Sequence, residues 1–124
     1  METEIEINGQ KYVLASTVKP PLAKAEVKKG MEYCIVRTYS AGVFAGYYDR
    51  KNKGKEGTVH EARRIYYWDG AASLSQMAND GVKKPSNCKF SQVNAEVDLK
   101  EIIEVIPCSA VAKKIIEGVS VWQQ

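Results

Sequence analysis

Three stretches rich in β-branched and aromatic residues lie close together between residues 32 and 68, and they constrain the fold more than any other feature. Residues 32–39 and 43–50 are joined by the short Ser40-Ala41-Gly42 segment. A charged, glycine-containing loop follows, and residues 58–68 form the third stretch. Residue types of this kind favour strands, and short glycine-containing joints favour hairpins. The pattern therefore predicts an antiparallel meander of three strands.

A shorter hairpin is predicted at the N-terminus. Asn8-Gly9 stands between two alternating segments, and this dipeptide is typical of a type I′ turn because both turn residues take positive φ. A two-residue turn fixes the register of the flanking strands. It pairs Ile7 with Gln10, Glu6 with Lys11, and Ile5 with Tyr12.

The chain length suits a single domain, because 124 residues are enough for one core and too few for two of ordinary size. We expect an N-terminal hairpin at 1–15, a connector at 16–30, and the main sheet and helices at 31–124. Pro20-Pro21 excludes a helix or a central strand from that part of the connector.

Two short helices are predicted after the meander. Residues 71–78 follow the Asp69-Gly70 break, with Asp69 or Gly70 as the N-cap, and residues 110–117 follow Ser109, a favourable N-cap. Segments around 89–92, 95–99 and 101–106 resemble further strands. The fold class is therefore predicted to be α+β, with an antiparallel sheet of about five to seven strands and two short helices.

The charge and hydropathy of the chain exclude several function classes. A net charge of +3 is well short of what a duplex-DNA binder carries, and the sequence string typical of RNA-binding sheets is absent, so we expect no specific nucleic-acid partner. The apolar runs are too short to span a membrane, and the N-terminal METEIEI segment lacks the features of a secretory signal. We therefore expect a soluble protein with no membrane partner.

No arrangement of residues indicates catalysis. The odd number of cysteines (Cys34, Cys88 and Cys108) and their spacing predict free thiols in a reducing cytoplasm. A zinc site would need His60, the only histidine, with thiolates from distant segments. Phosphate-loop and dinucleotide motifs are absent, and no serine has a histidine near it in sequence. We expect no metal, no cofactor and no enzymatic activity.

The segment RRIYYWDGAASLSQMA, residues 63–78, offers binding chemistry instead. Alternation along a strand places Arg64, Tyr66 and Trp68 on one face, about 7 Å apart in successive pairs. Rings stack on nucleotide bases, arginine forms forked bonds to phosphate, and backbone amides at a helix start attract anions. The predicted ligand-binding residues are Arg37, Arg64, Tyr66, Trp68, Gly70, Ala71 and Ser73.

An architectural alternative stays open for the same segment. The rings would form the core, the arginines would cover it with their stems, and Asp69 would cap the helix and occupy the amides that an anion needs.

The apolar C-terminal segment VSVW follows a helix stop at Gly118 and has no obvious partner segment in so small a domain. Trp122 exposed on a monomer would be an unusual apolar patch. We therefore expect a homo-oligomer.

Three strings, IVRTYSAGVFAG, ARRIYYWDGAASLSQMANDGVKKPSNCKFS and EVIPCSAVAKKIIEGVSVW, carry a family resemblance over about residues 32–122. The chain resembles a family of small proteins of unknown function encoded mainly by tailed bacteriophages and prophages. The family has no assigned activity, so no residue inherits a role. The resemblance implies an accessory protein in the host bacterial cytoplasm.

Together with the residue chemistry, this setting favours a protein that sequesters a nucleotide-derived bacterial immune signal without hydrolysis. The signal would be a cyclic oligonucleotide or a cyclic ADP-ribose type. The alternatives are an interaction protein that inhibits a host enzyme, a minor structural protein of the virion and, last, a small esterase or phosphodiesterase.

Overall fold

The structure, a computed structural model, describes residues 5–7, 10–12 and 23–124. Strands β1 (Ile5–Ile7) and β2 (Gln10–Tyr12) pair antiparallel, with Ile5 opposite Tyr12 and Ile7 opposite Gln10. The predicted register of the N-terminal strands is therefore confirmed. The Asn8-Gly9 turn and the Pro20-Pro21 pair lie outside the described residues.

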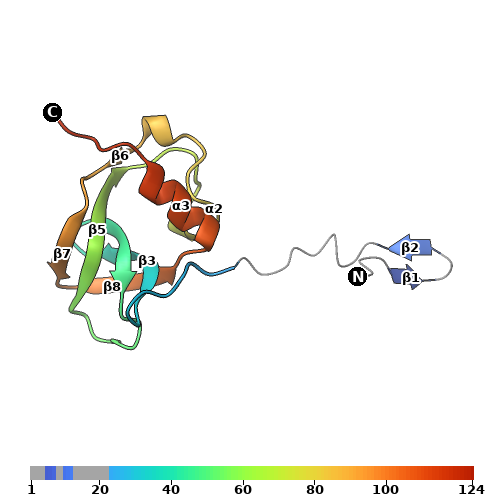
Figure 1. The fold of residues 1–124 in the computed structure, drawn as a ribbon, viewed down its shortest axis with the longest axis horizontal. Helices are drawn as coiled ribbons and strands as arrows, with labels where there is room; N and C mark the ends of the chain where they lie inside the picture. Colours follow the sequence, from blue (N-terminus) through green and yellow to red (C-terminus); the bar gives the residue numbers. More distant parts are fainter. Residues whose placement is uncertain (1–4, 8–9, 13–22) are drawn as a thin grey trace.

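Six further strands form one antiparallel sheet in the order β6-β5-β4-β3-β8, with β7 paired to the N-terminal half of β5 (Figure 1). The predicted meander is β3-β4-β5, and the α+β class with two helices is confirmed. The strands are β3 (Glu32–Thr38), β4 (Val43–Tyr48), β5 (Gly57–Tyr67), β6 (Lys89–Phe90), β7 (Asn94–Leu99) and β8 (Ile102–Pro107), and the helices are α2 (Leu74–Asp80), α3 (Ala110–Gly118) and a 3-10 turn at Pro85–Asn87.

The sheet is strongly curled. Strand β7 pairs with β5 and strand β8 pairs with β3, so the two lie on opposite edges of the sheet, yet only Lys100 and Glu101 separate them in the chain. The two edges therefore meet at this link. Helices α2 and α3 lie together over the outside of the curl (Figure 1).

Each face of the curled sheet buries its own core, because successive side chains along a strand point to opposite faces. The inner core, enclosed by the curl, consists of Cys34, Val36, Phe44, Tyr48, Val59, Ala62, Leu99 and Ile102. The helix-side core, between the sheet and the two helices, includes Tyr33, Ile35, Ala45, Tyr47, Ile65, Met77, Phe90, Ala112 and Ile116.

A β-bulge at Glu61 changes the face assignment along β5. Ala45 lies opposite Arg63, but Tyr47 lies opposite His60, so β5 carries one extra residue in this interval. Glu61 has φ +50°, the left-handed region, which costs a non-glycine residue about 1–2 kcal/mol. After the bulge, Ala62 and Arg64 point to the inner face, as Val59 does before it. Strict alternation would have placed them on the same face as His60, so the assumption of alternation along the whole of residues 58–68 is wrong.

The helix that follows β5 starts later than predicted. Ser73 is the N-cap of α2, and its hydroxyl accepts from the Gln76 backbone N–H at 3.1 Å. Asp69 instead accepts from Asn87 Nδ2 at 3.0 Å, so the prediction of Asp69 or Gly70 as cap is wrong. The predicted cap of α3 is confirmed, since Ser109 Oγ accepts from the Ala112 N–H at 3.0 Å.

The three cysteines are free and buried, as the sequence predicts. Burial raises the pKa of the Cys34 and Cys108 thiols to about 12, which keeps both protonated at neutral pH. Within the described parts of the chain, no group of three or more His, Cys, Asp or Glu side chains is placed to hold a metal ion.

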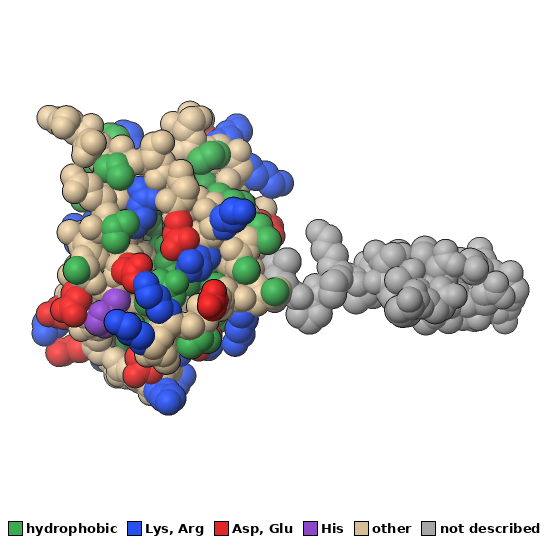
Figure 2. Space-filling model, viewed as in Figure 1, with side chains coloured by type: hydrophobic (Ala, Val, Ile, Leu, Met, Phe, Trp, Pro, Cys, Tyr) green, Lys and Arg blue, Asp and Glu red, His purple; other side chains and the backbone are tan. Residues whose placement is uncertain are grey.

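Figure 2 shows Lys and Arg side chains interleaved with Asp and Glu on the face that carries α3 and β5, so this face has no field of a single sign. Among residues 5–7, 10–12 and 23–124, no helix is long and apolar enough to cross a membrane.

Candidate functional site

Arg64 and Tyr66 of β5 belong to a row of alternating rings and cations, which we call the aromatic–cation row. The Arg64 guanidinium lies 4.7 Å from the centroid of the Phe44 ring and 6.0 Å from that of Tyr66. The Tyr66 and Trp122 rings meet edge to face with centroids 5.3 Å apart, and Lys89 Nζ lies 5.3 Å from the Trp122 ring. Two positive charges therefore flank two neighbouring rings.

The backbone holds Arg64 in a fixed place. Its N–H donates to Ser91 Oγ at 2.7 Å, its carbonyl accepts from the Ser91 N–H at 2.8 Å, and it lies opposite Phe44 in the sheet. The guanidinium forms no ion pair with any residue that the structure describes, and its Nε is buried without a hydrogen-bond partner there. A charge without a carboxylate beside it is suited to an incoming anion.

The second ring of the row comes from the C-terminal tail. Val121 forms a parallel bridge with Phe90 in β6, and the Trp122 N–H donates to the Phe90 carbonyl at 2.9 Å. Gln92 Nε2 adds a bond to Gln123 Oε1 at 3.2 Å. The tail therefore has a partner segment in its own chain, and the motive for predicting an oligomer from an unpartnered tail was wrong.

Both outer rings remain available on the surface. Tyr66 is 53% exposed and Trp122 is 49% exposed, whereas Phe44 is buried below Arg64. Neither Trp122 nor Lys89 is among the predicted site residues. The apolar VSVW segment was the sequence feature that drew attention to Trp122. The sequence has no periodic pattern from which the pairing of the tail with β6 could be predicted.

Trp68, a predicted partner of Arg64 and Tyr66, lies elsewhere. Its ring packs against the helix-side core, and its Nε1–H donates to the Ala71 carbonyl at 3.2 Å. The pairing of β5 with β6 has a second irregularity here: Ile65 pairs with Phe90, but Tyr67, two residues later, pairs with Lys89, which is only one residue from Phe90. Trp68 follows this irregularity and points to the helix side. The prediction that Trp68 shares a face with Arg64 is therefore wrong.

Gly70, Ala71 and Ser73 do not lie together at the start of a helix, the arrangement on which the prediction of an anion site rested. Helix α2 begins at Leu74, so the Gly70 and Ala71 amides precede the helix, and Ser73 is occupied as its cap. The Gly70 carbonyl accepts from the Lys83 N–H at 3.1 Å. These three residues act in the architecture of the loop before α2.

Arg37 is also separate from the row. Arg37 pairs with Val43 of β4, and Val43 pairs with Ile65 of β5. Residues that pair across strands point to the same face, and Ile65 is the neighbour of Arg64 in β5. Arg37 therefore lies on the sheet face opposite to Arg64. Its Nε donates to Glu104 Oε1 at 2.9 Å in an exposed ion pair. Of the predicted site residues, only Tyr66 lies with Arg64 in the aromatic–cation row.

Arg63, the neighbour of Arg64, is an internal anchor. Its side chain is 2% exposed, its Nε donates to the Ser91 carbonyl at 2.8 Å, and its Nη1 donates to the Ile116 carbonyl in the last turn of α3 at 2.8 Å. Desolvation by burial lowers the pKa of the guanidinium, and Tyr33 opposes this shift. Arg63 thus ties α3 to the sheet.

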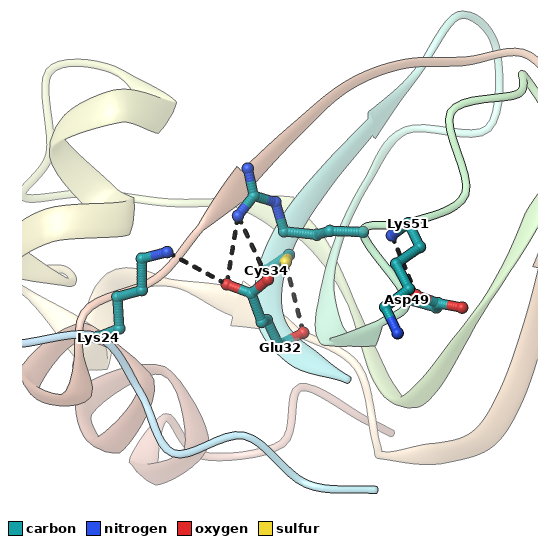
Figure 3. A network of polar contacts seen from close by, with 6 residues as sticks. Lys24, Glu32, Cys34, Asp49 and Lys51 are labelled. Atoms are coloured by element: carbon teal, nitrogen blue, oxygen red, sulfur yellow. Dashed lines mark hydrogen bonds and ion pairs between the residues drawn. The ribbon is translucent and has the colours of Figure 1, made fainter. Parts of the chain in front are cut away.

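The cations near Glu32 are compensated, in contrast to Arg64. Glu32 lies 3.6 Å from Lys24 Nζ and accepts from Arg50 Nη1 at 3.3 Å (Figure 3). The Asp49 carboxylate accepts from the Lys51 N–H at 3.0 Å. This network stabilises the junction of β3 with the loop after β4 and leaves Arg50 less available to an outside anion.

One comparison with known proteins gives a match. The profile of a family described as a domain of unknown function, DUF6948, matches residues 31–116, which run from the start of the main sheet into α3. No curated protein matches the chain, and no solved structure does. Because the profile covers more than half of the sequence, the chain belongs to the DUF6948 family.

Proposed function

We propose that this protein binds a small nucleotide-derived anion at the aromatic–cation row and holds it without chemical change. The observation that carries the proposal is the Arg64 guanidinium, which has no carboxylate partner among the described residues. It lies 6.0 Å from the centroid of the half-exposed Tyr66 ring, and that ring meets the half-exposed ring of Trp122. Base stacking contributes about 1–3 kcal/mol per base, and guanidinium binds phosphate through forked hydrogen bonds. Lys89 supplies a second cation for a second phosphate.

The row contains Arg, Lys and aromatic side chains and no carboxylate, histidine, serine or cysteine. It therefore offers recognition without the paired nucleophile and base that hydrolysis needs. The biological setting follows from the family resemblance. We propose a phage-encoded accessory protein that sequesters a cyclic oligonucleotide or cyclic ADP-ribose type immune signal in the host bacterial cytoplasm.

A protein partner is the second candidate for the same surface. Tyr, Trp and Arg dominate the energetics of protein interfaces, and Tyr66, Tyr67 and Trp122 are each about half exposed. This surface also suits contact with a second copy of the chain, and we propose a homo-oligomer. Light scattering at micromolar concentration tests that part, since a monomer mass contradicts it.

The experiment is a thermal-shift and calorimetry screen against cyclic dinucleotides, cyclic trinucleotides and cyclic ADP-ribose isomers. We expect Arg64→Ala to weaken binding at least about tenfold, the loss of one charge-assisted hydrogen bond or more. Stability should fall by no more than about 2 kcal/mol, the range of a cation–π contact. Mass spectrometry after denaturation should recover the ligand intact.

Arg37→Ala is the matched control, because Arg37 lies on the opposite face and is paired with Glu104. Binding that survives Arg64→Ala unchanged, or that is lost equally in Arg37→Ala, places the ligand elsewhere. Hydrolysed product in the recovered fraction overturns sequestration, and capture of a host protein without small-molecule binding favours the second candidate.

A further inference from the structure

A small depression lies on the helix side of β5, on the face opposite to the aromatic–cation row. Its volume is about 140 Å³, and it is lined by Tyr33, Glu61, Arg63, Val93 and Glu117. Sites for drug-sized ligands span about 300–1,000 Å³, so an occupant must be a small molecule.

Arg63 supplies a positive charge in the lining of this depression. Its Nε and Nη1 are used by the Ser91 and Ile116 carbonyls, but its Nη2 has no hydrogen-bond partner in the described residues. The arginine side chain is 2% exposed, and solvent does not reach Nη2. A buried donor left unpaired is costly. A ligand oxygen that displaced the atoms covering Nη2 and paired with it would remove that cost.

Two carboxylates form the rim. Glu61 is turned to this side at the β-bulge, and Glu117 comes from the last turn of α3. Lys28 Nζ binds Glu61 Oε2, and Lys113 Nζ binds Glu117 Oε1 at 3.0 Å. The other oxygen of each carboxylate has no partner among the described residues, and both side chains are nearly half exposed at 46% and 44%.

Two tyrosine rings and two lysines lie in or next to this lining. The Tyr33 and Tyr47 rings pack edge to face with centroids 5.3 Å apart, and Lys113 Nζ lies 5.5 Å from the Tyr33 ring. Lys28 Nζ lies 5.3 Å from the Tyr47 ring. The half-exposed Val93 adds an apolar wall. The carboxylates are therefore held in place next to an apolar surface.

This charge arrangement selects against simple ions. A lone anion attracted to Arg63 meets the Glu61 and Glu117 carboxylates, and a lone cation attracted to these meets Arg63, Lys28 and Lys113. Like charges in so small a space repel strongly. A molecule that carries both charges a short distance apart satisfies both sets of groups.

We propose that the depression binds a small zwitterion of the α-amino-acid class, with its carboxylate on Arg63, its ammonium between Glu61 and Glu117, and its side chain against Val93. This site is independent of the proposed nucleotide site on the other face of β5.

The test is calorimetry and thermal shift with single free L-amino acids, and with acetate, methylammonium and inorganic phosphate as one-charge probes. We expect at least one amino acid to bind saturably and each one-charge probe to bind at least about tenfold more weakly, since each lacks one charged contact. Val93→Trp fills the depression, and Glu117→Gln removes one rim charge. Each should weaken binding at least about tenfold.

Val111→Trp is the matched control, because Val111 is as exposed as Val93 (57% and 58%) and does not line the depression. It should leave amino-acid binding unchanged, as should Arg64→Ala. The proposal is overturned by an absence of binding across the amino acids, by acetate or methylammonium binding as tightly as the zwitterion, or by full affinity in both Val93→Trp and Glu117→Gln. Loss of amino-acid binding in Arg64→Ala would also overturn the independence of the two sites.

Discussion

Arg63→Met is expected to lower the free energy of unfolding by about 3–6 kcal/mol, because two hydrogen bonds from a charged donor, each worth about 1.5–3 kcal/mol, are lost together. Methionine keeps an unbranched apolar stem against Phe90, whose ring lies 5.4 Å from the guanidinium. The Ser91 and Ile116 carbonyls lose the donor that binds them at 2.8 Å. The Ile116 carbonyl, in the last turn of α3, keeps only the bond from the Val119 N–H at 3.3 Å, so the helix loses its tie to the sheet.

Urea unfolding measures this effect as a lower midpoint with an unchanged slope. The matched control is Arg37→Met. Arg37 is exposed and makes only a surface ion pair with Glu104, so its replacement should cost no more than about 1 kcal/mol. Equal losses in the two variants would contradict the anchoring role of Arg63.

Gly70→Ala is expected to be the next most damaging change, with a loss of about 3 kcal/mol from left-handed strain and overpacking together. Gly70 has φ +94°, which L-residues rarely adopt. A Cβ at this position would lie 2.5 Å from the Lys84 backbone nitrogen and even closer to that of Lys83. Backbone atoms cannot rotate away as a side chain can, so the loop at Gly70 or the segment at Lys83 must move.

Gly42→Ala separates the two contributions. Gly42 has a similar φ of +98°, but nothing lies within 4 Å of its added Cβ. Thermal unfolding should show a loss of only about 1–2 kcal/mol for Gly42→Ala, the strain alone. A Gly70→Ala variant as stable as Gly42→Ala would mean that the close approach to Lys83 and Lys84 is relaxed at no cost.

Local sequence signals predicted the parts of the fold that depend on neighbouring residues. The register of β1 with β2, the meander β3-β4-β5 and the Ser109 cap all follow from turn chemistry, strand propensity or capping within a few residues. The bulge at Glu61 was not predictable from alternation, because a residue with a long side chain takes a backbone conformation that usually belongs to glycine.

The candidate site was predicted in part for the same reason. Arg64 and Tyr66 are two residues apart on one strand after the bulge, so alternation placed them correctly relative to each other. Trp68 lies past the irregularity that begins at Ile65, where the period of two no longer holds. Trp122 enters the row through a parallel bridge to Phe90, a contact between distant segments that no local pattern encodes.

The short link at Lys100 and Glu101 has a consequence for how the chain reaches its native state. Strand β3 pairs with β8, and β5 pairs with β7, so strands made early in synthesis receive their edge partners from the last third of the sequence. Topologies dominated by such distant contacts fold slowly. A nascent chain that ends before residue 94 lacks β7, β8 and the whole of α3. It therefore leaves apolar side chains of both cores open to chaperones, proteases or other nascent chains until residues 94–118 have been made.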